Sequence, residues 1–206
     1  MKKEDTAQII RQLQKNGIEY NYLFFENEGH WITNKDNKFN LYYSLERFLT
    51  KYLGGNMEKL IYVDQPKDFN PKVEVSACFC KVGDKILFLK RNINKLYGGT
   101  WALPAGKLDE GETSSCAIIS EVFEETGISM QACDVQFLKT VYVRYPEYDF
   151  VYHMFKTELQ NFPKDFELNK VEHDEFAWLT LQEGVNFNLI PGEYECIKLL
   201  LDQKLL

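Results

Sequence analysis

The chain of 206 residues lacks two features that are typical of membrane proteins and of nucleic-acid-binding proteins. No apolar stretch approaches the length of a membrane span, so we expect no membrane partner. Positive charge is in deficit, because 24 Lys and Arg face 31 Asp and Glu for a formal net charge of −7. General nucleic-acid binding needs a basic surface, so we expect no nucleic-acid polymer as a partner. An acidic protein that handles phosphates needs local positive charge or a metal.

Cysteine is too scarce and too scattered for a disulfide framework. The five cysteines are odd in number and form no CxxC pattern typical of zinc sites; they are Cys78, Cys80, Cys116, Cys133 and Cys196. The chain begins Met-Lys-Lys-Glu-Asp, which is not the start of a signal peptide. We therefore expect reduced thiols and a cytoplasmic location.

Internal repeats and low-complexity tracts are absent too, and the length allows one large domain or a domain of about 150 residues with an extension. The composition, 45% hydrophobic and 15% aromatic, is ample for a packed core. Gly54-Gly55-Asn56 ends a helical pattern in the way a C-cap does. We therefore divide the chain into an accessory N-terminal segment, 1–56, and a main domain, 57–206.

Hydrophobic spacing predicts strands and helices that alternate along the chain. Helices are predicted at 5–16, 41–53, 113–126 and 192–203. Strands are predicted at 18–25, 73–81, 85–91, 135–145, 149–159 and 175–181, with a short strand entering a loop at 100–106. This order indicates an α/β fold in which helices pack on the faces of a mixed sheet.

What the sequence does contain is a cluster of glutamates in GKLDEGETSSCAIISEVFEETGI, residues 106–128. On a helix, Glu121, Glu124 and Glu125 fall within an arc of roughly 100°. Like charges at this spacing oppose helix formation by roughly 0.2–0.5 kcal/mol per pair. A bound divalent cation would offset that cost; the alternative is a solvated acidic face.

The same segment resembles the signature of the Nudix hydrolases, and in particular of the group related to MutT. Gly106 is followed six residues later by Glu112, and the run EVFEETGI (121–128) follows at the distance that the family uses. The resemblance covers about 72–206, and it includes the runs KILFLKR (85–91), LYGGTWALPAGKLDEGET (96–113) and EHDEFAWLTL (172–181). It implies a Nudix-type α/β/α sandwich with a mixed sheet.

The resemblance also implies an activity. Family members hydrolyse a phosphoanhydride that links a nucleoside diphosphate to a further group, through metal-assisted attack by water. We therefore expect an enzyme that acts on a small-molecule nucleotide, either a nucleoside triphosphate or a related nucleoside-diphosphate derivative. ADP-ribose or a nucleotide sugar is the alternative substrate within the class. The implied cofactor is Mg²⁺ or Mn²⁺, because hard cations prefer oxygen ligands.

The family pattern assigns metal ligands to this chain residue by residue. It implies that Glu121, Glu124 and Glu125 bind the metal and are catalytic. The carbonyl of Ala105, which stands where the family usually has glycine, is a further candidate ligand. Glu112 would be an outer ligand or would tie the loop to the helix.

Four further residues are candidates for the site. The resemblance implies that Arg91 contacts a substrate phosphate; the alternative is a surface charge at the end of a strand. Trp101 either stacks on a base or packs beneath the loop. Gly106 lets the backbone approach metal and substrate closely. Glu172 matches a loop carboxylate that acts as a metal ligand or base in some relatives, with a solvated acidic loop as the alternative.

One position departs from the family pattern. The family has arginine where this chain has Ser120, and that arginine holds the helix carboxylates in position. A serine cannot pair with a carboxylate charge, so we expect reduced activity or altered metal dependence, unless Lys107 or Lys90 substitutes. A Nudix-fold module that binds nucleotide without hydrolysing it is the rival hypothesis.

The accessory segment carries a second resemblance. Residues 13–55 resemble the C-terminal end of prolyl-oligopeptidase-type α/β-hydrolases, and EGH (28–30) matches the place of their catalytic histidine. Only 29 residues precede His30, and no Gly-x-Ser-x-Gly occurs in the chain, so no serine triad can be assembled. We expect the segment to pack on the main domain or on a partner chain, which would make the protein a homodimer.

Overall fold

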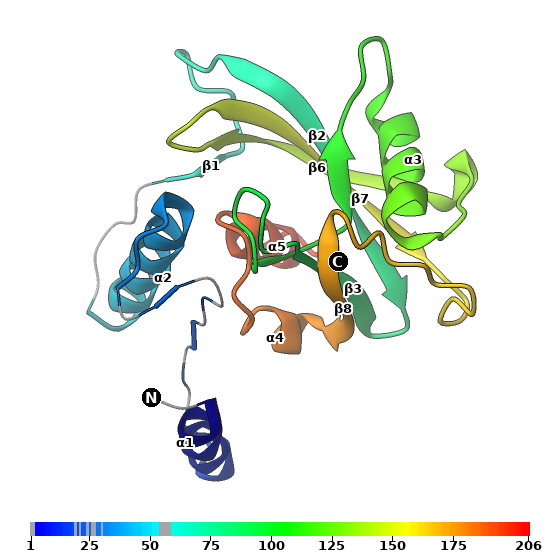
Figure 1. Ribbon diagram of the computed structural model, residues 1–206. Coiled ribbons are helices and arrows are strands. Elements are labelled where there is room, and N and C mark those ends of the chain that lie inside the picture. Colours follow the sequence, from blue (N-terminus) through cyan, green and yellow to red (C-terminus); the bar gives the residue numbers. More distant parts are fainter. Residues whose placement is uncertain are drawn as a thin grey trace.

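A mixed β-sheet forms the centre of the computed structural model, which describes residues 3–18, 20, 22, 23, 25, 28, 29, 31–53 and 59–206 (Figure 1). Its strands are β1 (Ile61–Tyr62), β2 (Pro71–Val82), β3 (Lys85–Arg91), β4 (Trp101–Ala102), β5 (Ala105–Lys107), β6 (Gln136–Arg144), β7 (Asp149–Glu158) and β8 (His173–Thr180). The order is β1-β6-β7-β2-β3-β4, while β5 pairs with β2 and β8 pairs with β3. The β2–β7 pair is parallel and the other pairs are antiparallel.

Helices cover both faces of this sheet. The helices are α1 (Lys3–Lys15), α2 (Lys35–Leu53), α3 (Ser114–Thr126), α4 (Leu181–Gly184) and α5 (Glu193–Asp202), with a 3₁₀ turn at Ala132–Asp134. Two separate cores lie on the two faces, one against α5 and the other against α3 (Figure 1). The predicted α/β/α sandwich is thus confirmed.

The sequence of the central strand β2 is apolar without alternation because both faces of the strand are buried. Successive side chains point to opposite faces of a strand. Ala77 and Phe79 therefore enter the core against α5, while Cys78 and Cys80 enter the core against α3. A strand buried on both faces has no polar face to show in its sequence.

The acidic helix α3 begins and ends where its capping residues predict. Thr113 accepts a hydrogen bond from the backbone N–H of Cys116 (3.3 Å), and Gly127 ends the helix in the left-handed region at φ 72°. A threonine at the N-cap and a glycine after the last turn satisfy backbone groups that the helix itself leaves unpaired. These two caps fix where the helix begins and ends.

The strand predicted at 18–25 is wrong for the residues that the structure describes there. Residues 18, 20, 22, 23 and 25 belong to no strand, and the others lie outside the described residues. A strand is stable only when a neighbour satisfies its backbone N–H and C=O groups, and no sheet strand pairs with these residues. His30 of the EGH run also lies outside the described residues.

The second helix begins earlier than predicted because polar residues cap it. The Asn34 side-chain oxygen accepts from the backbone N–H of Asn37 (3.1 Å), as N-cap residues do. The Glu28 carboxylate accepts from the backbone N–H groups of Thr33 and Asn34, each at 2.8 Å. These hydrogen bonds, with one from the Asn37 side chain, lower the pKa of Glu28 to about 2. Glu28 thus has a structural role at the start of α2.

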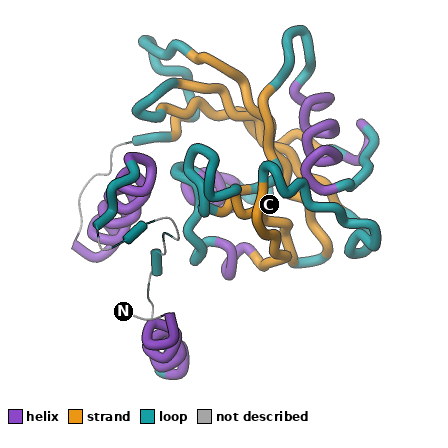
Figure 2. The backbone as a smooth tube through the Cα atoms, viewed as in Figure 1, coloured by secondary structure: helices purple, strands orange, loops and turns teal. Residues whose placement is uncertain are grey.

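Helix α2 contacts the main domain through hydrogen bonds of Tyr43 and an ion pair of Lys35 with Glu147 (3.8 Å). The Tyr43 hydroxyl donates to Glu195 Oε2 (2.5 Å) and accepts from the backbone N–H of Gly192 (3.2 Å), at the start of α5. Figure 2 shows α2 beside the main domain and α1 set apart from it in this view. In the described part of the chain, no helix combines the length and the apolar character that crossing a bilayer requires.

Candidate active site

A cavity of about 300 Å³ lies between α3, β5, the loop after β3 and the start of α5. One end is lined by the three glutamates of α3 together with Ala105 and Gly106, and we call it the acidic end. The other end is lined by Tyr145, Tyr148, Phe150 and Tyr152, and we call it the aromatic end. The cavity collects most of the predicted site residues, so it is the candidate active site.

Glu125 is the best fixed of the three helix carboxylates. It is buried, its Oε2 accepts from the backbone N–H of Ala105 (3.1 Å), and its Oε1 lies 2.7 Å from His173 Nε2. Burial raises the pKa of Glu125, although the hydrogen bond and the charge of His173 act in the opposite direction. Two partners, at the starts of strands β5 and β8, therefore hold this carboxylate in one place.

Glu121 packs directly on the backbone of Gly106. A Cβ atom added at position 106 would lie 1.8 Å from the Glu121 carboxyl carbon, so a larger residue there would displace the Glu121 carboxylate. Burial, and then the nearby carboxylates of Glu125, Glu124, Glu112 and Asp109, raise the pKa of Glu121 to about 7. The acidic end therefore holds more negative charge than its surroundings neutralise, which is the electrostatic condition that a bound cation relieves.

The carboxylates at the acidic end do not converge on a common point. Among the described residues, no group of three His, Cys, Asp or Glu side chains is placed so that it could hold a metal ion. Glu125 faces Ala105 and His173, whereas Glu124 is exposed on the helix surface. The donor set, all oxygen, fits a hard cation in kind, but the three carboxylates would have to move closer together to bind one.

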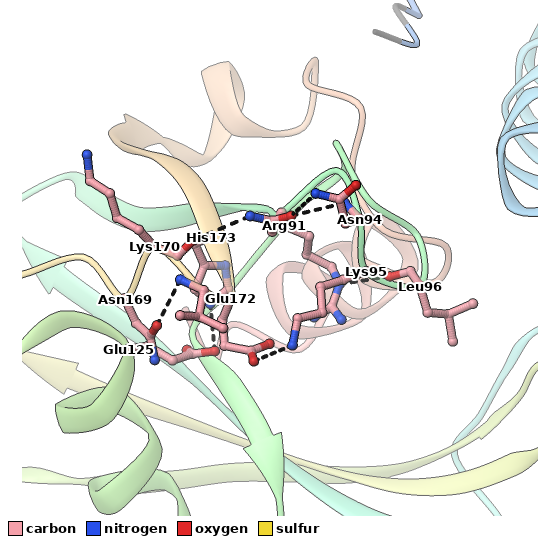
Figure 3. A network of polar contacts seen from close by, with 11 residues as sticks. Arg91, Asn94, Lys95, Leu96, Glu125, Asn169, Lys170, Glu172 and His173 are labelled. Carbon is pink, nitrogen blue, oxygen red and sulfur yellow. Dashed lines mark hydrogen bonds and ion pairs between the residues drawn. The ribbon is translucent and has the colours of Figure 1, made fainter. Parts of the chain in front are cut away.

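A loop before β8 joins α3 to the loop after β3 (Figure 3). The backbone N–H of Asn169 donates to the Glu125 carbonyl (2.9 Å), and that of His173 donates to the Asn169 carbonyl (2.9 Å). On the other side, the backbone N–H of Asn92 donates to the Glu172 carbonyl (2.8 Å). The loop thereby carries His173 and Glu172 into the cavity.

Glu172 lines the cavity and forms an ion pair with Lys95 (Figure 3). Arg91 lines the cavity too, and its Nε donates to the carbonyl of Leu96 (3.0 Å). These contacts place both predicted residues at the cavity. The Lys95 partner means that Glu172 is a paired carboxylate in this arrangement.

Two predicted residues lie away from the cavity lining. Trp101 is buried in the core and packs edge-on against Phe187, with ring centroids 5.1 Å apart. This is the packing alternative, and stacking on a base is not supported by the position. Glu112 accepts a hydrogen bond from the backbone N–H of Asp109 (3.2 Å), so it ties the loop before α3.

The position that departs from the family pattern makes no contact with the glutamates. Ser120 is exposed on α3. Lys90 pairs with Glu175 (2.8 Å), so it does not replace an arginine at position 120. The role of holding a helix carboxylate falls to His173 instead.

Sequence reasoning missed His173 and the lining of the aromatic end. His173 adjoins Glu172 in the sequence, but its burial and its approach to α3 depend on how the loop folds back. At the aromatic end, the Tyr145 hydroxyl donates to the Pro191 carbonyl (2.6 Å), and the Tyr152 hydroxyl donates to Glu193 Oε2 (3.2 Å). Such residues look like ordinary core positions in a sequence.

Comparison with known proteins identifies the family to which the α/β/α sandwich and its acidic helix belong. The profile of the NUDIX domain family matches residues 70–200, and the chain belongs to this family. The prediction of a Nudix hydrolase is thereby confirmed at the level of the family. The profile of the prolyl oligopeptidase family matches residues 2–56, which is less than half of the chain and shows a resemblance only.

Individual relatives agree with this placement. The chain is 31% identical over 77 residues to an 8-oxo-dGTP diphosphatase of Proteus vulgaris, which covers 37% of this chain and 67% of that protein. The fold is similar to that of a MutT protein from Methanosarcina mazei Go1, with a TM-score of 0.55, 23% identity, and coverage of 65% and 95% of the two chains. It is also similar to a bifunctional NMN adenylyltransferase/ADP ribose pyrophosphatase from Francisella tularensis complexed with AMP and Mn ion, with a TM-score of 0.52, 23% identity, and coverage of 82% and 47%.

Proposed function

We propose that the chain hydrolyses the phosphoanhydride of a nucleoside triphosphate, or of a related nucleoside-diphosphate derivative, with Mg²⁺ or Mn²⁺. The observation that carries this proposal is the cavity with one acidic and one aromatic end. A nucleotide has the matching chemistry, because its polyphosphate binds metal while its base is flat, aromatic and edged with polar groups. Neither end alone would favour a nucleotide over other ligands.

The acidic end would hold the metal. We assign Glu121, Glu124, Glu125 and the carbonyl of Ala105 as ligands on the basis of their oxygen chemistry and the family pattern. When bound, the ion would neutralise charge on the phosphoryl oxygens and lower the pKa of a bound water. Burial and then the neighbouring carboxylates raise the pKa of Glu121, and the carboxylate part of this effect supports the assignment.

The chain's own cations would bind the phosphates. Arg91 and Lys107 both line the cavity, and they supply the local positive charge that an acidic protein needs for a polyphosphate. Glu172 would act as a base or a further ligand only after leaving its ion pair with Lys95. His173 would keep Glu125 in place, as hydrogen-bond partners of metal ligands do.

A nucleoside triphosphate is favoured as substrate by the relative named 8-oxo-dGTP diphosphatase, which is the more similar in sequence. The likeness to an ADP ribose pyrophosphatase rests on fold alone and keeps ADP-ribose as the second candidate. A substrate panel decides between them. It should contain the deoxynucleoside triphosphates, 8-oxo-dGTP, ADP-ribose and nucleotide sugars.

The test of the proposed function is release of phosphate or pyrophosphate from this panel with Mg²⁺, with Mn²⁺ and with a chelator. Turnover that needs the metal supports the proposal. Tight binding without any turnover would instead support a module that binds nucleotide and does not hydrolyse it. Turnover that a chelator leaves unchanged would contradict the metal assignment.

The accessory segment supports a proposal about assembly. Leu45, Phe48, Leu49 and Tyr52 are exposed on α2 at a spacing that forms one apolar stripe. We propose that a second copy of the chain covers this stripe in a homodimer, which sedimentation would test by mass. The cytoplasm remains the predicted location.

A further inference from the structure

A buried carboxyl group lies at the aromatic end of the cavity. Glu193, the first residue of α5, lines the cavity and is only 4% exposed. Its Oε2 accepts a hydrogen bond from the Tyr152 hydroxyl (3.2 Å), while its Oε1 is buried and has no partner among the described residues. An unsatisfied buried acceptor costs about 1–3 kcal/mol, so a hydrogen-bond donor supplied by a ligand would remove this cost.

The surroundings of Glu193 suit a flat aromatic ligand. The rings of Phe150 and Tyr152 lie edge to face with centroids 6.1 Å apart, and those of Tyr145 and Phe150 lie 5.1 Å apart. Aromatic side chains of this kind bind bases through their faces without reading the base identity. Identity must be read by a polar group at the edge of the base, and among these residues Glu193 carries the unpaired polar atom.

We propose that Glu193 determines base specificity by accepting hydrogen bonds from a guanine-type edge of the substrate. The proposal rests on the proposed function, because it places the base of the nucleotide at the aromatic end. It also gives the unpaired Oε1 a partner that is present only when substrate is bound.

The chemistry of the carboxylate selects this edge. An ionised carboxylate only accepts hydrogen bonds, and it has about four acceptor positions on two oxygens. Guanine offers two adjacent donors, N1–H and the 2-amino group. One can bind Oε1, and the other can share Oε2 with the Tyr152 hydroxyl. Hypoxanthine has N1–H but lacks the amino group, so it would leave one of these positions unfilled.

The position of Glu193 favours the ionised form once a ligand supplies donors. The residue stands at the N-terminus of a ten-residue helix, where the helix dipole stabilises a negative charge. The Tyr152 hydroxyl already donates to one oxygen. A neutral carboxyl would instead offer one donor and one acceptor, which matches adenine or cytosine, so the base preference tests the assignment.

The experiment compares kcat/KM for dGTP and dITP, which differ only in the 2-amino group, and for dATP. In the wild-type protein we expect dGTP to exceed dITP and dATP by at least about 10-fold, the scale of one hydrogen bond to a charged group. Glu193→Gln should reduce the dGTP/dITP ratio at least about 10-fold, because an amide has one acceptor oxygen. Asp202→Asn, at the exposed end of the same helix, should keep the wild-type ratio.

A second variant, with measurements of folding, distinguishes loss of base recognition from loss of the fold. Tyr152→Phe keeps the carboxylate but removes the donor that orients it, so the ratio should fall by less than in Glu193→Gln. Circular dichroism and the melting temperature of each variant show whether it is folded. An unchanged ratio in folded Glu193→Gln, or a wild-type preference for dATP, overturns the inference while leaving the proposed hydrolysis intact.

The inference stays testable if the proposed hydrolysis fails. Base recognition does not need turnover, so calorimetric titration with dGMP and dIMP measures it separately. Tighter binding of dGMP that is lost in Glu193→Gln supports the role of Glu193 even without catalysis. Equal binding of the two monophosphates by the wild-type protein overturns it.

Discussion

The two ends of the cavity differ in how the chain builds them. The acidic end comes mainly from one continuous segment, 105–125, in which helix geometry places three carboxylates together. The aromatic end gathers Tyr145, Phe150 and Tyr152 from around the β6–β7 turn and Glu193 from α5. Chemistry encoded within one segment can be recognised in a sequence. A surface assembled from distant segments becomes visible only in the fold.

Replacing the helix carboxylates should produce the largest effect. In Glu124→Gln and Glu125→Gln we expect kcat/KM to fall by about 10²–10³-fold, as when a charge-stabilising group is removed from an active site. The fold should persist, because the amide keeps the shape of the side chain. Initial rates with Mg²⁺ and the substrate that the panel identifies would measure the loss.

The matched control for these variants is Glu110→Gln, an exposed glutamate in the loop before the same helix. It should keep the wild-type rate. Wild-type rates in all three proteins would mean that the acidic end is a solvated face, and the contrast between the two ends would disappear.

The second prediction concerns the aromatic end, where the buried carboxyl group of Glu193 should lower the stability of the fold. Burial is the largest of the effects that raise the pKa of Glu193 to about 7, above the usual 4.5. The folded protein then binds more protons than the unfolded chain, so the free energy of unfolding falls as pH rises from about 4.5 to about 7. Over this pH range, ionisation of Glu193 should lower the free energy of unfolding by on the order of 3 kcal/mol.

Glu193→Gln should remove this cost. Urea unfolding at pH 5 and pH 8 should show that the variant gains stability relative to the wild type mainly at pH 8. If the difference between the two proteins is the same at both pH values, the carboxyl group does not titrate as described. A variant that gains stability while losing base selectivity would identify the buried charge as functional.

The third prediction tests the close approach of the Glu121 carboxylate to the Gly106 backbone at the acidic end. Gly106→Ala places a methyl group 1.8 Å from the Glu121 carboxyl carbon, so Glu121 must move. A displacement on the order of 1 Å in an active site costs about 10²-fold in rate. Gly111→Ala is the control, because its Cβ would meet no atom within 4 Å. Its φ of 79° predicts a loss of about 1 kcal/mol in stability but no loss of kcat.

Residues near the same cavity show how far sequence reasoning extends. The helix predicted at 113–126 is found at Ser114–Thr126 with caps at Thr113 and Gly127, because capping depends on neighbours within one turn. Trp101 left two alternatives, since packing and stacking need the same aromatic side chain. His173 lies 48 positions from Glu125, and only the fold of the intervening chain brings them together. Contacts of that range carry no local pattern.

The fourth prediction concerns this long-range contact. His173→Phe removes the hydrogen bond to Glu125, and we expect a 10–100-fold loss of kcat/KM, approximately the cost of losing a partner of a metal ligand. His173→Gln keeps an N–H donor and should recover part of the loss, which a purely structural role in packing would not explain. Equal activity in both variants and the wild type would mean that Ala105 alone holds Glu125.

The smallest effect is expected where the accessory segment meets the main domain. Tyr43→Phe removes the hydroxyl that contacts Glu195 and Gly192, and its loss should lower the free energy of unfolding by about 1–2 kcal/mol. Tyr42→Phe is the matched control, because Tyr42 is 65% exposed on the same helix. Gly192 precedes Glu193, so loosening this contact should weaken base selectivity more than metal-dependent turnover. Selectivity unchanged in Tyr43→Phe would mean that the aromatic end is formed by the main domain without support from α2.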